Sequence, residues 1–379
     1  MARFLITGAR APVALELVRN LSCNGHQVCI ADSLNYPLAK NSRHVKKYRL
    51  IAEPGTQLKK FQQDLIKYIK EEEIDYLLPT CEEVFYVSFL KSELSKYCNV
   101  ICDSFDLLST LHSKYTIMEL ALDCGISLPV TEKVNASGLK SYKDKIKNKV
   151  IKKEFSRFGI DVLLISDRKL FNQYIKYRSG NFVVQEKIKG IEYSTYSIAY
   201  NGVVMAHSCY QSLYRVTNSA GYYFKAVKHV KIQKFVSLFV EKHGYTGQIG
   251  FDIIDNGDDI YLIECNPRAT SGVHLLKNED LAACLLGNAQ QSSIMPGKPV
   301  MIAMAMNLIA LPRAVSEFKL VQWYRDYCLA EDIMASNGDR SYILYSLVSL
   351  LELIKKSILK KTSLRTASTQ DIEWDGRPL

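Results

Sequence analysis

Acidic and amide side chains recur at strand spacing in the segment 247–272, GQIGFDIIDNGDDIYLIECNPRATSG. Glu264 and Asn266 are two residues apart on an otherwise apolar run, so a β-strand points both side chains to one face. Asp252 lies on the preceding apolar run, across a turn that contains Asn-Gly. Carboxylate and amide oxygens on one face are ligands that Mg²⁺ or Mn²⁺ prefers. The segment therefore predicts a β-hairpin that carries a divalent metal site.

The metal prediction depends on the register of this hairpin. Asp252 joins the face of Glu264 and Asn266 if the turn has an odd number of residues, whereas a two-residue Asn-Gly turn places Asp252 on the opposite face. Alternation alone also allows both acids to be solvated on an exposed sheet face. Arg268 can pair with a carboxylate or a phosphoryl group through its guanidinium fork, or it can be structural.

The elements that would position these residues lie in regions with different secondary-structure patterns. Residues 3–31 read as strand, helix and strand, and further strand candidates follow at 76–79 and 99–102, as in a small doubly wound α/β domain. From residue 149 onward, short strands separated by turns predict an α+β region. The expected domains are residues 1–105, 106–290 with a division into 106–185 and 186–290, and a mostly helical 291–379.

The run Glu264-Cys265-Asn266-Pro267-Arg268, preceded by Phe251-Asp252, resembles the metal-binding signature of the ATP-grasp superfamily. Carboxylate-amine ligases and proteins similar to the large subunit of carbamoyl-phosphate synthase carry such segments. The resemblance covers roughly residues 1–290 in order. It implies an N-terminal Rossmann-like pre-ATP-grasp domain, a two-subdomain ATP-grasp fold and a C-terminal helical extension. It also implies an enzyme that uses ATP and Mg²⁺ to activate a carboxylate as an acyl phosphate and joins it to an amine.

The same resemblance implies nucleotide contacts along the chain. Lys152 ends a strand before a small-residue loop, and family members use such a lysine and loop to hold and cover the phosphates. Lys153 stands where the family commonly has proline, so which lysine points inward stays open. For the lysines and glutamates, a solvated surface position is the alternative. The implied contacts are phosphate ligands Lys152, Ser156 and Gly159, a first basic nucleotide contact at Lys114, an adenine edge of Gln185, Glu186 and Ile188, and Glu192 for the ribose hydroxyls.

The stretch 208–224, SCYQSLYRVTNSAGYYF, resembles the part of the family fold that faces substrate. Arg215 in this stretch can hold a carboxylate or the transferred phosphoryl group, although a tyrosine-rich loop also serves as packing. We expect Lys152, Arg215 and Arg268 to be the catalytic residues, since each brings positive charge to a phosphoryl transfer. The expected partners are a small-molecule carboxylate and an amine.

Charge and cysteine content restrict the class of protein further. The formal net charge of +10 is spread along the chain rather than clustered, which argues against a nucleic acid partner. Ten cysteines occur without a CxxC pair, so free thiols in a reducing cytoplasm are expected. The segment MARFLITGAR lacks the apolar stretch of a secretion signal. We therefore expect a cytoplasmic protein.

The C-terminal region carries an apolar run at 342–354 that is shorter than the roughly 20 residues needed to cross a bilayer. Four lysines follow it, at positions 355, 356, 360 and 361. A buried helix and an amphipathic helix lying on an anionic membrane both fit this pattern. A homodimer interface in this region is a third alternative.

Two other functions compete with the ligase. Residues 6–10 open a strand-helix-strand unit and Asp32 follows the second strand, as in dinucleotide-dependent enzymes, but the GxGxxG spacing is missing. A non-catalytic ATP-binding protein is the second alternative. It is disfavoured because Lys152, Asp252, Glu264 and Asn266 occur together.

Overall fold

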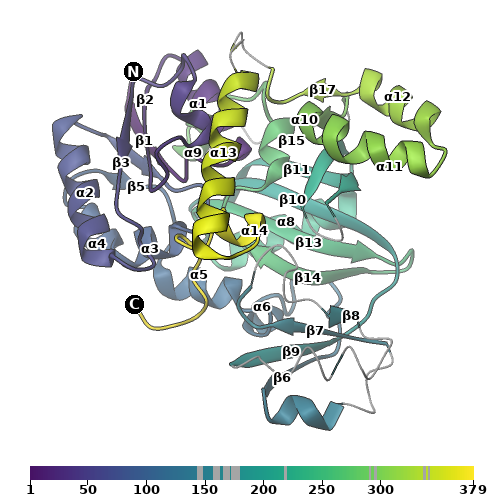
Figure 1. The fold of residues 1–379 in the computed structure, drawn as a ribbon. Helices are drawn as coiled ribbons and strands as arrows, with labels where there is room; N and C mark the ends of the chain where they lie inside the picture. The colour runs from purple at the N-terminus through teal and green to yellow at the C-terminus, as the bar shows by residue number, and fades with distance from the viewer. Residues whose placement is uncertain are drawn as a thin grey trace.

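The computed structural model describes residues 1–142, 148–156, 163–164, 171, 180–216, 220–289, 292–293, 297–335, 339 and 342–379. Within them the chain forms three β-sheets, and a long C-terminal helix returns to the N-terminal sheet (Figure 1). In this part of the chain, no helix combines the length and the apolar character needed to cross a membrane.

The N-terminal sheet is parallel, with the strand order β3-β2-β1-β4-β5. Its strands are β1 (Arg3–Thr7), β2 (Gln27–Asp32), β3 (Lys47–Leu50), β4 (Tyr76–Leu78) and β5 (Asn99–Val100). The helices of this region are α1 (Pro12–Cys23), η1 (Leu38–Asn41), α2 (Leu58–Glu71), α3 (Val84–Phe89), α4 (Lys91–Leu94), α5 (Phe105–His112) and α6 (Thr116–Leu120). Strand β1 is an apolar run because helices cover both faces of the sheet. All carboxyl ends of the strands meet at one edge.

The central sheet has the order β14-β13-β10-β11-β12-β16-β17, with β15 beside β11. Its strands are β10 (Ile191–Tyr200), β11 (Val203–Arg215), β12 (Gly221–Ala226), β13 (Gly247–Asp255), β14 (Ile260–Asn266), β15 (Ser292–Ser293), β16 (Val300–Met301) and β17 (Glu331–Asp332). Its helices are α8 (Val230–Lys242), η3 (Ser271–Leu275) and α9 (Leu281–Leu285). Phe235 and Phe239 of α8 pack edge-on against Phe251 of β13. These contacts belong to a core that continues into the N-terminal sheet.

The small sheet has the order β6-β9-β7-β8 and lies below the central sheet in Figure 1. Its elements are β6 (Thr131–Asn135), η2 (Gly138–Tyr142), β7 (Lys149–Lys153), β8 (Leu163–Leu164) and β9 (Asn181–Glu186). Ile151, Phe182 and Val184 form part of a compact core that is separate from the two larger clusters. A sheet with its own core can change its position relative to the rest of the protein without unfolding.

The C-terminal segment is built from short helices and one long helix. They are α10 (Ala303–Ala305), η4 (Met306–Ala310), α11 (Leu311–Ser316), α12 (Leu320–Leu329), α13 (Tyr342–Lys360) and α14 (Leu364–Ala367). Helices α11 and α12 project from the edge of the central sheet, whereas α13 lies across the N-terminal half (Figure 1). Tyr214 of β11 holds α12 through a 2.7 Å hydrogen bond to the Asp326 carboxylate.

A buried ion network fixes the C-terminal tail to the N-terminal sheet. The Arg10 guanidinium lies 2.6 Å from Asp32 and 2.8 Å from Asp371, and Lys356 lies 3.0 Å from Asp371. Beyond this point, Trp374 stacks against aromatic side chains. These are Phe85, Phe105, His112 and Phe155. The tail therefore connects the N-terminal sheet to the segment that follows β7.

Asp371→Asn should destabilise the protein by about 3–5 kcal/mol, because it leaves the buried Arg10 charge without one of its partners. Although burial alone raises it, the Arg10 charge holds the pKa of Asp371 well below its usual range. The contribution is therefore complete above the unfolded pKa of about 3.9 and is lost progressively as the pH falls from there toward the depressed folded pKa. Urea unfolding of variant and wild type at neutral and acidic pH measures both effects.

Asp375→Asn is the matched control, since this carboxylate pairs with the exposed Arg377 side chain. An exposed pair contributes about 0–1 kcal/mol. Equal stability losses in the two variants, or a loss at Asp371 that persists in acid, would contradict the assigned role of the ion network.

Candidate active site

The register of the β13–β14 hairpin brings the predicted acids together. Asp255 pairs with Ile260, so the turn between them has four residues, an even count that by itself would put Asp252 on the opposite face. A β-bulge in β14 nevertheless brings the two acids opposite each other, because Ile253 pairs with Leu262 but Asp252 pairs with Glu264. The extra residue in β14 shifts the alternation by one. Asp252 and Glu264 therefore lie opposite each other on one face of the hairpin, as the metal-site prediction requires.

Hydrogen bonds connect the Asp252 carboxylate to two neighbouring side chains. Asn266 Nδ2 donates to Asp252 Oδ2 at 3.3 Å, and Ser194 Oγ donates to Asp252 Oδ1 at 2.6 Å. Burial, followed by the nearby Glu264 charge, raises the pKa of Asp252 to about 7. Two facing carboxylates in a desolvated place favour either a proton or a cation between them. The two carboxylates thus fit a hard divalent cation, whereas the Asn266 Oδ1, which accepts from Arg268 Nη2, would have to turn toward them to become a ligand.

The set would leave part of the coordination sphere of such a cation to other molecules. Among the residues that the structure describes, no group of three or more His, Cys, Asp or Glu side chains could hold a metal ion. The candidate protein ligands are therefore the carboxylates of Asp252 and Glu264 and the amide of Asn266. Mg²⁺ is typically held in this way, by one or two carboxylates together with water and phosphate oxygens of a substrate.

Two buried lysines face the acids. Lys114 Nζ lies 3.5 Å from Glu264 Oε2 and donates to the Ser156 carbonyl at 2.6 Å. Lys152 Nζ donates to Gln185 Oε1 at 2.9 Å. Burial lowers the pKa of Lys152 to about 8, and the Glu264 carboxylate opposes this shift. Lys153 is only half-buried, so Lys152 is the lysine of the pair that points inward. Buried ammonium groups of this kind gain stability from a polyanion.

The proposed adenine edge is constrained by existing hydrogen bonds. The Gln185 side chain is buried between Lys152 and Thr131, with a 3.1 Å bond from Nε2 to Thr131 Oγ1. The Glu186 N–H donates to the Val130 carbonyl at 2.8 Å. An adenine ring at this edge would therefore meet backbone groups other than the Glu186 N–H. Ile188 is half-buried, and Gly159 lies outside the described residues.

Glu192 and Arg215, which the sequence analysis treated separately, form an ion pair. Arg215 Nη1 lies 2.5 Å from Glu192 Oε2, and the Arg215 Nε donates to the Ser212 carbonyl at 3.2 Å. The two residues come from the neighbouring strands β10 and β11. Both side chains are partly exposed, so a ligand can reach either charge.

Glu82 is a site residue that the sequence analysis missed. Its Oε1 accepts from Arg268 Nε at 2.6 Å, and Arg268 Nη2 in turn donates to Asn266 Oδ1 at 2.9 Å. Glu82 is fully buried and lies 3.9 Å from His112, whose pKa burial lowers to about 4. The available signal was its place just after β4, since ligand sites in parallel sheets form beyond the carboxyl ends of strands.

Comparisons with known proteins agree with this arrangement. Residues 112–272 match the family model of an ATP-grasp domain. A tyramine–L-glutamate ligase from Methanocaldococcus jannaschii is 26% identical over 241 residues, 62% of this chain and 68% of that protein. An N5-carboxyaminoimidazole synthetase from Staphylococcus aureus has a TM-score of 0.62 at 14% identity, over 83% of this chain and 86% of its own. An L-amino acid ligase from Bacillus licheniformis has a TM-score of 0.63 at 14% identity, over 79% and 78%.

Asp252→Asn should weaken Mn²⁺ binding by more than about 10-fold, because even the hydrogen-bond partners of metal ligands cost about that much when they are removed. The measurement is Mn²⁺ electron paramagnetic resonance in the presence of ADP. Asp255→Asn is the matched control on the same strand, since Asp255 pairs with His229 instead of Glu264. Unchanged Mn²⁺ affinity in the Asp252 variant would remove the metal assignment.

Proposed function

The chain belongs to the ATP-grasp superfamily through residues 112–272, and on that premise we propose that it is an ATP-dependent carboxylate-amine ligase. The observation that carries the proposal is the convergence of two facing acids and an amide with two buried lysines. Such a site would hold a divalent cation on its acids and would offer the positive charge of its lysines to the phosphates of a nucleotide. The names of both ligase relatives include an amino acid as a substrate, which supports an amino acid as one substrate here.

Asp252, Glu264 and Asn266 would hold Mg²⁺ or Mn²⁺ in this proposal. A bound cation of this kind neutralises charge on the phosphates of ATP. Lys152 and Lys114 supply further positive charge from the opposite side of the site. Their hydrogen bonds to Gln185 Oε1 and the Ser156 carbonyl hold both ammonium groups in position before a nucleotide arrives. Preorganised charge of this kind stabilises a phosphoryl transfer without further rearrangement.

The reaction would proceed in two steps that need no enzyme nucleophile. The substrate carboxylate attacks the γ-phosphorus of ATP, the bond to the β-phosphate oxygen breaks, and ADP leaves. The amine then attacks the carbonyl carbon of the acyl phosphate, loses a proton, and expels phosphate. Arg268 and Arg215 would bind the carboxylate and the transferred group through their guanidinium forks. Glu82 acts as a positioning residue, since it holds Arg268 Nε at 2.6 Å.

The remaining nucleotide contacts are proposed from the same fold. Ser156 and Gly159 would cover the phosphates, the backbone at Gln185, Glu186 and Ile188 would meet adenine, and Glu192 would accept from the ribose hydroxyls. Glu192 is free to do so only if its pair with Arg215 opens or is shared. A carboxylate suits the ribose because it can accept from two hydroxyl groups at once.

The domain assignment follows from the proposed fold. The parallel N-terminal sheet would be the Rossmann-like pre-ATP-grasp domain, residues 1–105. The ATP-grasp fold would occupy residues 106–290, divided at 185, and residues 291–379 would be the C-terminal extension. The small sheet supports the division, because its core is separate. All ten cysteines are free thiols, which supports a reducing cytoplasm as the location.

The dinucleotide-dependent alternative loses its main support. Asp32, the acid that would bind a ribose, is buried and takes its hydrogen bonds from Arg10 and the Leu34 N–H. A carboxylate in a closed ion pair cannot accept from ribose hydroxyls without breaking that pair. A measurement of ATP turnover distinguishes the ligase from the non-catalytic ATP-binding alternative.

Product analysis tests the proposed reaction. ATP supplied with a pool of amino acids should give ADP and phosphate, and release should rise when the correct carboxylate is present, because the acyl phosphate forms only with that group in line. Hydroxylamine should trap the acyl phosphate as a hydroxamate, detected by mass spectrometry. AMP and pyrophosphate would instead indicate adenylation. Tight ATP binding that no carboxylate stimulates would indicate the non-catalytic alternative.

Glu82→Gln should lower kcat by about 10–100-fold with little change in the KM for ATP, since the variant frees Arg268 and disturbs Asn266 without touching the nucleotide lysines. Steady-state kinetics with ATP varied gives the split. Glu83→Gln is the control, since Glu83 is buried like Glu82 but its Oε1 accepts from Thr7 Oγ1 and the Thr80 N–H instead of from Arg268. An equal loss of kcat in both variants would make Glu82 merely structural.

A further inference from the structure

Helix α13 exposes an apolar stripe. Leu347, Leu351, Ile354 and Ile358 follow one another at intervals of four, three and four residues, which is the spacing of one helix face. Their exposed fractions lie between 38 and 70%, and the adjoining Leu359 is 72% exposed. Isolated apolar side chains on a surface are ordinary, but a continuous row of them marks a docking face.

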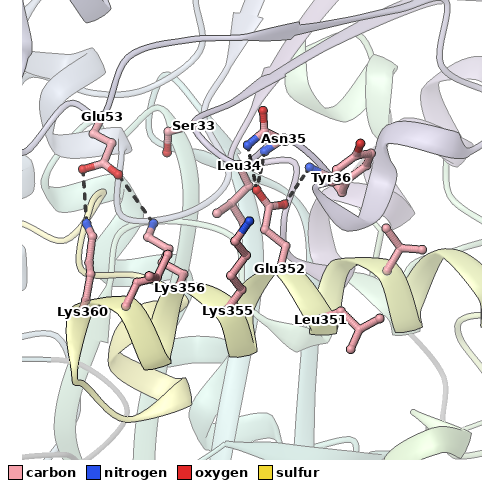
Figure 2. A pocket seen from close by; sticks show the side chains of 12 residues that line it. Ser33, Leu34, Asn35, Tyr36, Glu53, Leu351, Glu352, Lys355, Lys356 and Lys360 are labelled. Carbon is pink, nitrogen blue, oxygen red and sulfur yellow. Dashed lines mark hydrogen bonds and ion pairs between the residues drawn. The ribbon is translucent and has the colours of Figure 1, made fainter.

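A basic groove runs beside the stripe. A cavity of about 530 Å³ lies between α13 and the loop 33–36 that follows β2. Figure 2 shows Lys355, Lys356 and Lys360 rising from the helix, with Lys356 and Lys360 directed at Glu53. Glu53 lies 3.8 Å from Lys356 and 3.6 Å from Lys360. The groove thus combines cationic groups with the apolar side chains of its rim.

Two of the three lysines in the groove are already paired. Lys356 pairs with Glu53 and with Asp371, and Lys360 pairs with Glu53. Glu352, the only acid in the sequence of α13, accepts from the backbone N–H groups of Asn35 and Tyr36 at 2.8 and 2.7 Å. Lys355 and, just past the helix end, Lys361 are exposed, and within the described residues neither forms an ion pair. An anionic group beside the stripe would therefore meet ammonium groups that no carboxylate pairs with.

We propose that α13 docks this protein on an anionic lipid surface, with lipid phosphates at Lys355 and Lys361 and the apolar stripe at the acyl boundary. Amphipathic helices bind membranes in this manner when apolar area and lysine charge act together. Each lysine near an anionic leaflet strengthens binding by about fivefold. The cytoplasmic leaflet carries such anionic lipids. The inference is independent of the proposed ligase reaction.

Charge distinguishes this partner from a second copy of the chain. Two α13 stripes packed together would bring Lys355, Lys360 and Lys361 against a helix whose single acid, Glu352, already accepts three hydrogen bonds. Such a pair would place like charges beside an apolar seam. An anionic surface supplies the missing negative charge.

Vesicle co-sedimentation of the full chain tests the proposal. The protein should bind vesicles of phosphatidylcholine and phosphatidylglycerol in equal parts, should not bind phosphatidylcholine alone, and should release as salt rises. Lys355→Ala should weaken binding by about fivefold, and Ile358→Ser should weaken it further because it removes apolar area. The controls are Lys60→Ala on α2 and Val321→Ser on α12, both exposed. Unchanged thermal unfolding verifies that every variant is folded.

Three results would overturn the proposal. The first is failure to bind the mixed vesicles, or equal binding to phosphatidylcholine alone. The second is an equal effect of the control variants, which would move the contact away from α13. The third is a dimer, measured by light scattering, that Ile358→Ser dissociates, because the stripe would then belong to a second copy. Displacement by inorganic phosphate together with no effect of Ile358→Ser would instead identify a soluble phosphate compound as the ligand.

Discussion

Two carboxylates that face each other on a bulged hairpin determine which charges the rest of the site must supply. Burial and the charge of Glu264 raise the pKa of Asp252 to about 7, so the two carboxylates take up positive charge far more readily than free carboxylates do. The surroundings supply positive charge in response, from Lys114 at 3.5 Å and from the buried Lys152. A site of this composition is stabilised when a divalent cation and a polyphosphate enter together.

The N-terminal and central sheets meet at this site through one chain of polar contacts. Glu82, at the carboxyl edge of the N-terminal sheet, holds Arg268, and Arg268 holds Asn266 of the acid set. The C-terminal tail adds a second link, because Trp374 packs edge-on against Phe155 in the segment after β7. The small sheet has its own core, and Glu154 attaches its edge by accepting from Ser113 Oγ at 2.8 Å. Movement of that sheet would change the phosphate side of the site while the acid side stays fixed.

The C-terminal helices relate to the site in different ways. Helix α12 is tied to β11, the strand that carries Arg215, through Tyr214 and Asp326. Helix α13 is tied to the N-terminal sheet through Lys356 and Asp371, and its outer face stays apolar and basic. A helix that is anchored on one side by ion pairs presents its other side to a surface at a fixed orientation. A ligase anchored in this way would act on substrates close to that surface.

The local sequence pattern determined several strands and part of the candidate site. Strand alternation put Glu264 and Asn266 on one face, and apolar runs located β1, β2 and the hairpin, because these features depend on neighbours in the chain. Alternation also allowed only one of Lys152 and Lys153 to point inward, but burial in the folded chain selected Lys152. The side of Asp252 was decided by a bulge in β14. Glu82 reached Arg268, 186 positions along the chain, only through the packing of two sheets. The role of Gly159 stays a prediction. Long-range partners such as Glu82 and Arg268 leave no periodic pattern in the sequence, because the packing of the sheets sets the distance between them.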